Sequence, residues 1–201
     1  MAPGSFCAGI EMKKFKRKTK RLIIRPLEKT DFEAWREAFL TMLPKQNKWD
    51  ATASFNVENL KKSNFNKIIK KSAQNRKAEE YCDFGVFLKS SGELLGRMGV
   101  GHFIRSVTQS ALIGYTIYNQ HWGHGYSTEA VNAVIDIAFK DYELHRLVAG
   151  IEPGNKASIR VVKKLGFRKE GVSKRIVYIN DEWTDLLQYA LTTEDRKSAK
   201  I

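Results

Sequence analysis

The strongest chemical signal in the chain is a pair of glycines placed just before a helix. The segment reads Gln120-His-Trp-Gly-His-Gly125 and is followed by Tyr126-Ser-Thr-Glu-Ala130. The first residues of a helix have unpaired backbone N–H groups and a partial positive charge, and glycines let an anion approach them closely. The spacing therefore predicts an anion site, with a pyrophosphate as the expected anion.

Residue types exclude several classes of site. A triphosphate loop needs Gly-Lys-[Ser/Thr], which is absent here, and the dinucleotide fingerprint needs a third glycine where Thr128 stands. Cys7 and Cys82 are the only cysteines, so we expect neither a disulfide framework nor a four-ligand zinc site, and a reducing compartment is expected. NTPase and dehydrogenase functions are therefore disfavoured, and no metal is expected.

The elements that must position this loop follow from the hydrophobic pattern. A strand over 111–118 precedes the loop, and apolar residues with a period near 3.6 predict a helix from Ser127. Further strands are expected over 21–26, 81–88, 94–104 and 147–151, with a hairpin formed by 171–179 and 183–191. Helices are expected from Thr30 or Asp31 to before Pro44, over 57–78, and from an Asn155 N-cap to Gly166. The predicted class is α/β, or mixed α+β.

Size and charge indicate one basic globular domain. The chain has 201 residues, is 42% hydrophobic and carries a formal net charge of +13. Seven basic residues stand against one acidic residue up to Arg21, and seven stand against none from Lys61 to Lys77, so these two blocks hold the whole excess. The first block predicts a flexible basic arm over 1–20.

The two basic blocks suggest partners without identifying them. Contact with RNA or an acidic surface through Lys13 to Arg21 and Lys61 to Lys77 is one interpretation, and a solvated helix face is the simpler explanation of the second block. Aromatic residues do not alternate with the basic ones as in RNA-binding modules. The start of the chain lacks a signal-peptide pattern, and no apolar run approaches the roughly 18 residues of a membrane span, so we expect a cytoplasmic protein without membrane contact.

The glycine loop resembles the acyl-CoA loop of GNAT N-acetyltransferases, Gln/Arg-x-x-Gly-x-Gly/Ala. The stretch from Trp122 to Ala130 is similar to the RimJ/RimL branch, whose members acetylate N-terminal residues of ribosomal proteins. Four further matches occur in the same order: Arg21-Leu-Ile-Ile-Arg-Pro26, Ile113-Gly-Tyr115, Asn155-x-x-Ser158 with Lys164-Leu-Gly-Phe167, and Glu170-Gly171 with Trp183-Thr-Asp185. The resemblance implies a GNAT domain over 21–195, followed by a tail over 196–201.

The resemblance also implies how acetyl-CoA is bound. Backbone N–H groups from His121 to Ser127 are expected to hold the pyrophosphate, and the strand near Ile117 to pair with pantetheine in the gap that GNAT folds leave beside the next strand. A backbone N–H near Tyr118 is expected to polarise the thioester carbonyl. The implied CoA-binding residues are Ile117, Tyr118, Gln120, His121, Trp122, Gly123, His124, Gly125, Tyr126, Ser127, Asn155 and Ser158. Asn155 also fits a plain helix cap, and Lys156, Arg160 and Lys163 are either 3′-phosphate ligands or solvated.

The expected catalytic residues are Ser158, Tyr118 and His102. Ser158 matches the serine that RimL-like enzymes use as the acid for the leaving thiol, although a hydrogen bond at the helix start explains it equally well. The glutamate that serves these enzymes as base corresponds to Val177, and the strand over 111–118 has no carboxylate. The remaining candidates for the base are His102, Tyr178, and a water chain to an acid within 37–50.

The expected activity is direct transfer of acetyl to a primary amine, and the acceptor stays open. A protein N-terminal α-amine, in particular a ribosomal one, is the first hypothesis. A small amine such as an antibiotic or polyamine is the second, and a catalytically silent CoA-binding module, favoured by Val177, is the third. The acceptor pocket is expected within 37–60, and either a monomer or a homodimer is compatible with the sequence.

Overall fold

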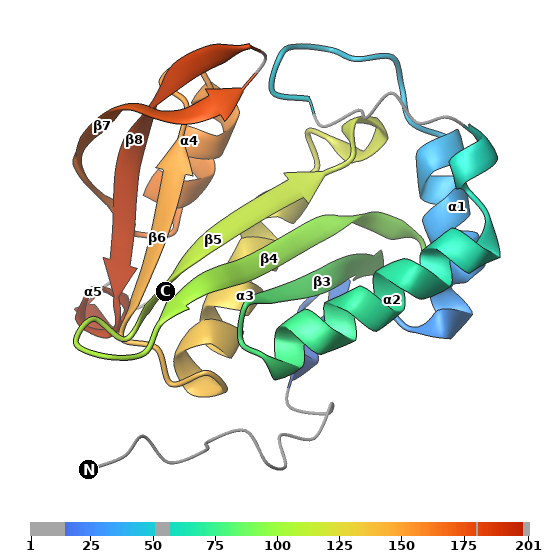
Figure 1. Ribbon diagram of the computed structural model, residues 1–201, viewed down its shortest axis with the longest axis horizontal. Coiled ribbons are helices and arrows are strands. Elements are labelled where there is room, and N and C mark those ends of the chain that lie inside the picture. The colour runs from blue at the N-terminus through green and yellow to red at the C-terminus, as the bar shows by residue number, and fades with distance from the viewer. Residues whose placement is uncertain (1–14, 51–56, 180, 199–201) are drawn as a thin grey trace.

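The computed structural model describes residues 15–50, 57–179 and 181–198. They form one eight-stranded mixed sheet in the order β1-β2-β3-β4-β5-β6-β8-β7 (Figure 1). The strands are β1 Arg17–Lys18, β2 Leu22–Arg25, β3 Tyr81–Leu88, β4 Leu94–Ile104, β5 Ser110–Ile117, β6 Arg146–Ile151, β7 Arg168–Ile179 and β8 Glu182–Thr192. All neighbouring strands are antiparallel except β5 and β6, which are parallel.

Helices cover both faces of the sheet, which confirms the predicted mixed α/β class. One face carries α1 Phe32–Leu40 and α2 Lys62–Lys77, and the other carries α3 Tyr126–Lys140 and α4 Lys156–Lys164 (Figure 1). Short 3-10 turns, η2 Lys29–Asp31, η3 Val57–Asn59 and η4 Asn119–His121, and the final helix α5 Thr193–Ser198 complete the described elements. The helix predicted over 57–78 is therefore divided into η3 and α2.

Two hydrophobic cores fix the sheet between the helices. The apolar side of α3 is fully buried with β2 to β6 in the larger core. On the other face, Trp35 of α1 and Phe65 of α2 lie with ring centroids 5.1 Å apart and pack beside Phe87 and Leu94. Because both faces are covered, the strand ends that surround the glycine loop are held in place.

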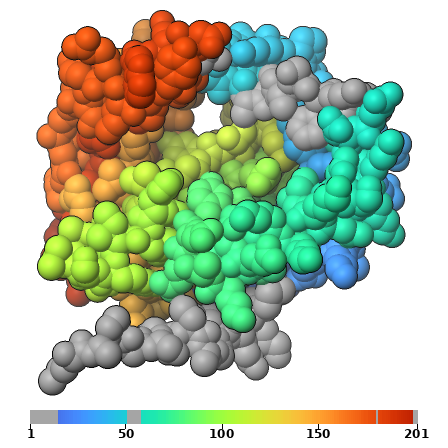
Figure 2. Space-filling view, in the orientation of Figure 1, coloured from blue at the N-terminus to red at the C-terminus, as the bar shows by residue number. Residues whose placement is uncertain are grey.

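The central parallel strands separate soon after they start. β5 and β6 pair only at Ser110↔Arg146, Ala111↔Leu147 and Leu112↔Val148. Beyond these pairs β5 continues with β4, and β6 continues with β8 as far as Ile151↔Leu187. Figure 2 shows an opening between the orange-red β7–β8 hairpin and the yellow-green end of β5. The expected divergence of these two strands is confirmed.

Residues 15–20, for which the sequence predicts a flexible arm, are part of the folded structure. Phe15 is buried and stacks on Tyr142 with ring centroids 4.9 Å apart. Arg17 pairs with Asp141 at 2.6 Å, and β1 pairs with β2. The described part of the predicted arm therefore packs against the domain, through the buried Phe15 ring, the Arg17 ion pair and the β1–β2 pairing.

The ends of the predicted domain also need adjustment. Residues 196–198, predicted as tail, belong to α5, and residues 1–14, with Lys13 and Lys14, lie outside the described part of the chain. Among the described residues, no helix is both long and apolar enough to cross a membrane.

We predict that Phe15→Ala lowers the free energy of unfolding by about 3 kcal/mol, because truncation of a buried aromatic ring leaves a cavity. Urea unfolding followed by tryptophan fluorescence measures the loss. Lys16→Ala, at an exposed neighbouring position, is the control and should change stability by less than about 0.5 kcal/mol. Equal stability of the two variants would show that the segment before β2 is not packed.

Candidate active site

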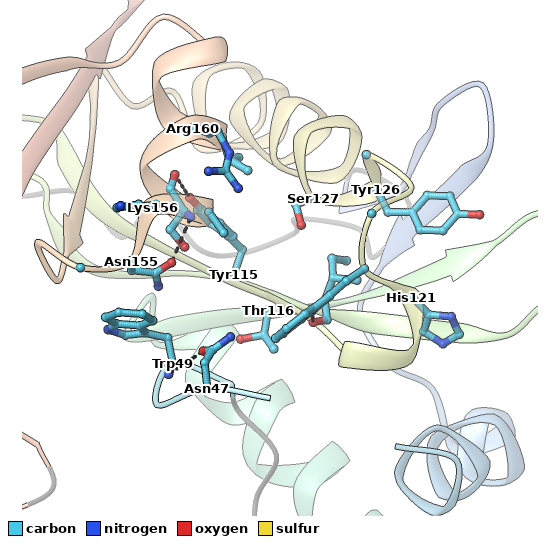
Figure 3. Close-up of a pocket in the computed structure, with 18 residues that line it drawn as sticks. Asn47, Trp49, Tyr115, Thr116, His121, Tyr126, Ser127, Asn155, Lys156 and Arg160 are labelled. Carbon is cyan, nitrogen blue, oxygen red and sulfur yellow. Dashed lines mark hydrogen bonds between the residues drawn. The ribbon is translucent and has the colours of Figure 1, made fainter. Parts of the chain in front are cut away.

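A cavity of about 510 Å³ lies where β5 and β6 separate (Figure 3). Its wall combines the end of β5, the loop before α3, the first turns of α3 and α4, and a segment that precedes α2. The lining residues are Asn47, Trp49, Tyr115, Thr116, Ile117, His121, Trp122, Gly123, Gly125, Tyr126, Ser127, Gly154, Asn155, Lys156, Ala157, Ser158, Arg160 and Val161. Most of the predicted CoA-binding residues are therefore brought together.

The glycine loop has the geometry of an anion site. Gly123 and Gly125 have φ of 83° and 75°, a left-handed conformation that favours glycine. Gly125 is the N-cap of α3 and has no side chain to bond the first N–H groups of the helix. A Cβ added to Gly123 would meet nothing within 4 Å, so the space beside it is open. These free donors beside an open cavity fit the pyrophosphate of acetyl-CoA.

Arg21 braces this loop from the edge of β2. Its Nε donates to Glu129 Oε2 at 2.7 Å, and its Nη1 donates to the His124 carbonyl at 2.9 Å. Its guanidinium lies 4.6 Å from the centroid of the Tyr126 ring. Burial alone would raise the pKa of Glu129, but hydrogen bonds from Thr19 and Arg21 outweigh it and lower that pKa. The ionised Glu129 thus holds Arg21 against the loop.

The structure corrects the predicted role of Tyr118. Its N–H donates to the Leu95 carbonyl at 2.9 Å, so this group is not available to a thioester. Its buried ring packs 5.4 Å from Phe39, and burial raises the pKa of the hydroxyl to about 12. Successive N–H groups of a strand point to opposite sides, so those of Tyr115 and Ile117 point into the gap beside β5.

The loop also contacts this edge of β5 directly. Trp122 Nε1 donates to the Ile117 carbonyl at 2.6 Å, so the indole folds back onto the strand. The contact places Trp122 on the cavity wall beside Ile117. The end of β5 and the glycine loop therefore form one continuous surface.

Asn155 and Ser158 lie together in the first turn of α4. Asn155 Oδ1 accepts the Ser158 N–H at 3.1 Å, which confirms the predicted helix cap. The Ser158 carbonyl accepts the Tyr115 hydroxyl at 3.0 Å, and this bond joins α4 to β5 across the gap. Burial raises the pKa of Tyr115 to about 12, so the phenol stays protonated and remains a donor at neutral pH. Both Asn155 and Ser158 line the cavity.

Besides Tyr118, three predicted residues do not line the cavity. Gln120 Nε2 donates to the Ala38 carbonyl at 3.0 Å, so this side chain holds the end of α1 instead. His124 stacks on Tyr126 outside the cavity. His102 is exposed, with φ of 53°, beyond the Gly101↔Leu112 pair and therefore at the far end of β4. The structure does not bring His102 to the site.

His121 lines the cavity without adding charge to it. Burial lowers the pKa of its imidazole although Glu93 lies 3.5 Å away. The ring is therefore neutral near pH 7. In Figure 3 its side chain and that of Tyr126 point away from Tyr115 and Asn155. The His121 N–H donates to the Tyr118 carbonyl at 2.9 Å and the Trp122 N–H to the Asn119 carbonyl at 3.3 Å, so these two predicted pyrophosphate donors are already engaged within the loop.

The segment over 43–50, which lies within the range 37–60 where the sequence predicts the acceptor pocket, contributes Asn47 and Trp49 to the cavity wall. Asn119 Oδ1 accepts the Leu43 N–H at 2.8 Å, and Asn119 Nδ2 donates to Asp50 Oδ2 at 2.9 Å. At the other side of the gap, Lys48 pairs with Glu152 at 3.1 Å. A Cβ on Gly154 would lie 2.5 Å from the Trp49 ring, so Trp49 packs directly on that glycine. The segment thus spans from the end of β5 to the loop after β6.

Carboxylates are absent from the lining of the cavity as far as the described residues go, whereas Lys156 and Arg160 contribute positive charge. Val177, which the resemblance places at the position of the base, pairs with Thr184 in the β7–β8 hairpin, and Tyr178 beside it is 59% exposed. The described residues also contain no cluster of three or more His, Cys, Asp or Glu that could hold a metal ion. The site is therefore suited to a polyanionic ligand.

A mixed sheet with two diverging central strands, and a glycine loop that starts a helix beside them, defines the class of acyl-CoA-dependent N-acetyltransferases. The family described as Acetyltransferase (GNAT) domain matches residues 21–168. The chain belongs to the GNAT acetyltransferase family.

Individual proteins similar to this chain are also acetyltransferases by name. The chain is 36% identical over 181 residues to the probable N-acetyltransferase YjcK of Bacillus subtilis, covering 89% of this chain and 97% of that protein. It is 33% identical over 112 residues to the [ribosomal protein uS5]-alanine N-acetyltransferase of Escherichia coli, which is 56% of this chain and 58% of that one. Mycobacterium smegmatis RimJ in complex with CoA-disulfide is a structural neighbour with a TM-score of 0.75 and 26% identity, covering 87% of this chain and 83% of that one.

We predict that Arg21→Lys raises the Kd for CoA about fivefold to tenfold, because a lysine cannot reproduce the fork that contacts Glu129 and the His124 carbonyl. Isothermal titration measures this change. Arg36→Lys, at an exposed site whose ion pair spans 4.0 Å, is the control and should bind CoA as the unaltered protein does. An unchanged Kd in Arg21→Lys would contradict the bracing role.

Proposed function

We propose that this protein transfers acetyl from acetyl-CoA to the N-terminal α-amine of a protein or peptide, with a ribosomal protein as the acceptor. The observation that carries the proposal is a cavity whose wall comes from both faces of the sheet. The loop before α3 and the first turn of α4 line it on one face, and Asn47 and Trp49 line it on the other. A cofactor and an acceptor chain can therefore approach the gap from opposite faces.

The residues present fit acetyl-CoA, which supplies an activated acetyl thioester. N–H groups of the glycine loop would hold the pyrophosphate, and Lys156 and Arg160 would attract the 3′-phosphate. The edge of β5 would pair with pantetheine as an added strand pairs with a sheet. The N–H groups of Tyr115 and Ile117, instead of that of Tyr118, would stabilise negative charge on the thioester oxygen.

Two protons must be handled when the neutral amine attacks the thioester carbon and the thiolate leaves. Ser158 is placed to donate a hydrogen bond to the leaving sulfur, since it lies in the first turn of α4 on the cavity wall. Tyr115 and Tyr118 remain protonated at neutral pH and cannot serve as the base. With no carboxylate among the described lining residues, we propose that the ammonium form of the acceptor loses one proton to solvent before attack, and that the second proton, released from the nitrogen as the amide forms, is taken up by the leaving thiolate.

Two findings favour a protein acceptor over a polyamine. The described lining contains Lys156 and Arg160 and no carboxylate, which disfavours a multiply charged cation. The relative in Escherichia coli carries the name of a ribosomal-protein alanine N-acetyltransferase.

A panel of acceptors tests the proposal. Alanine- and serine-starting peptides, spermidine and an aminoglycoside are each incubated with acetyl-CoA, and released CoA is followed with a thiol reagent. We expect release with the peptides and an acetyl group on the α-amine by mass spectrometry. Faster release with spermidine or the aminoglycoside would sink the proposed acceptor, and binding of acetyl-CoA without release would identify a silent module.

We predict that kcat/KM for an alanine-starting peptide rises with pH and levels off above an apparent pKa of about 7.7–8.0, the ordinary range of an α-amine. The amine reacts only when neutral. No carboxylate among the described lining residues is present to accept its proton at lower pH. Initial rates between about pH 6 and pH 9.5 measure the profile. A plateau that already begins near pH 6 would contradict the prediction and indicate a base on the enzyme.

We predict that Ser158→Ala lowers kcat about tenfold to a hundredfold and leaves the KM for acetyl-CoA nearly unchanged, because the lost hydrogen bond forms only as the thiolate leaves. Steady-state kinetics separate the two constants. Ser63→Ala, in the exposed first turn of α2, is the matched control and should keep full turnover. Full turnover in Ser158→Ala would leave Ser158 with a structural role only.

A further inference from the structure

The outward side of α2 carries a dense block of positive charge. The five lysines of this helix, Lys62, Lys67, Lys70, Lys71 and Lys77, are all exposed. The helical repeat of about 100° per residue places Lys67, Lys70, Lys71 and Lys77 on the side opposite Phe65. We call these four residues the lysine face.

The apolar side of α2 is already occupied by the fold. Phe65 is fully buried and lies 5.8 Å from Phe32, and Ile68 and Ile69 pack against the same core. The remaining exposed residues between the lysines are the polar Ser63, Asn66 and Gln74 and the small Ala73. The lysine face thus has no aromatic or large apolar side chain beside it to offer a partner.

Acidic residues do not neutralise this charge from within the helix. There is no Asp or Glu from Lys61 to Lys77. Two of the acids that follow the helix are committed elsewhere, because Glu79 pairs with Arg105 at 2.7 Å and Asp83 pairs with Arg97 at 3.1 Å. The lysines do not stabilise α2 itself, since like charges one helical turn apart repel each other.

The lysine face lies on the same side of the molecule as the opening beside β5. In Figure 1, α2 crosses the near side of the sheet, and in Figure 2 the green α2 and the opening are visible in one view. The first turns of α3 and α4, which line the proposed pyrophosphate site, belong to the opposite face. The charge of α2 therefore lies on the face of the sheet from which the acetyl acceptor is proposed to approach.

We propose that the lysine face binds the phosphate backbone of double-stranded RNA. Lysines release counterions when they meet phosphates, and Ser, Asn and Gln side chains hydrogen-bond phosphate and sugar oxygens. Protein interfaces have an apolar or aromatic centre and are depleted in lysine, which this surface does not match. Single-stranded RNA is bound through stacking aromatic residues, which this face lacks. Of these partners, an RNA duplex contacted through its backbone, independently of sequence, matches the lysine face best.

This inference does not depend on the identity of the acetyl acceptor, because RNA binding is measured without acetyl-CoA. The probe is a fluorescent RNA duplex of about 20 base pairs, titrated with the full chain at several salt concentrations between about 50 and 200 mM. Lys67→Gln/Lys70→Gln/Lys71→Gln removes three charges from the lysine face. Lys164→Gln/Lys169→Gln/Lys197→Gln removes three exposed charges from α4, β7 and α5 as the matched control.

We expect the α2 variant to bind the duplex at least about fivefold more weakly at low salt, and the slope of log K against log salt to fall by about two to three, as loss of three phosphate contacts requires. The control should bind nearly as the unaltered protein does. Circular dichroism melting checks that both variants are folded.

Two results would overturn the proposal. Equal weakening in both variants would show that net charge alone attracts RNA. Binding of polyglutamate that depends on the α2 lysines, together with RNA binding that does not, would assign the surface to an acidic protein partner. Neither result bears on acetyl transfer, so failure here and failure of the proposed acceptor are distinguishable.

Discussion

The site depends on the short pairing between β5 and β6. Three residue pairs join these parallel strands, after which each strand is committed to its antiparallel neighbour, β4 or β8. Backbone groups at the end of β5 are consequently left without a neighbouring strand at the centre of a sheet, where edges are normally absent. The gap is held open from both sides, since α3 is buried beneath the sheet and Tyr115 ties α4 to β5 through the Ser158 carbonyl. A ligand that pairs with the N–H groups on this edge of β5 gains hydrogen bonds without any change in the fold, although the Ile117 carbonyl is already bonded to Trp122.

The other parts of the cavity are braced by long-range polar contacts. Arg21 and Glu129 connect the edge of β2 to the start of α3, and Asn119 connects the end of β5 to residues 43–50. Lys48 and Trp49 then reach the loop after β6. These contacts close a ring around the gap, which explains how a loop with two left-handed glycines keeps its donors directed at one space. Positive charge at Lys156 and Arg160 lies on this ring, whereas the lysines of α2 lie outside it.

Local patterns in the sequence predicted the elements well because periodicity and caps are local properties. The strands β3 and β4, the Asn155 cap and the glycine loop all lie where the pattern placed them. The contacts that the sequence did not predict join residues that are far apart in the chain. Phe15 is buried against Tyr142, more than 100 residues away in the chain, and Asn119 bonds to the Leu43 backbone and to Asp50. Tyr118 failed as the thioester donor because strand register decides which N–H groups face β4, and His102 failed because register also sets which end of β4 meets the site.

Amide hydrogen exchange of individual residues, measured by NMR with and without CoA, tests most directly whether the free edge of β5 is the binding surface. The account predicts that CoA slows exchange at Tyr115 and Ile117 and through the glycine loop. The amide of Tyr118, already bonded to the Leu95 carbonyl, should exchange as before. Protection confined to the glycine loop, with Tyr115 and Ile117 unchanged, would contradict a ligand that pairs with β5.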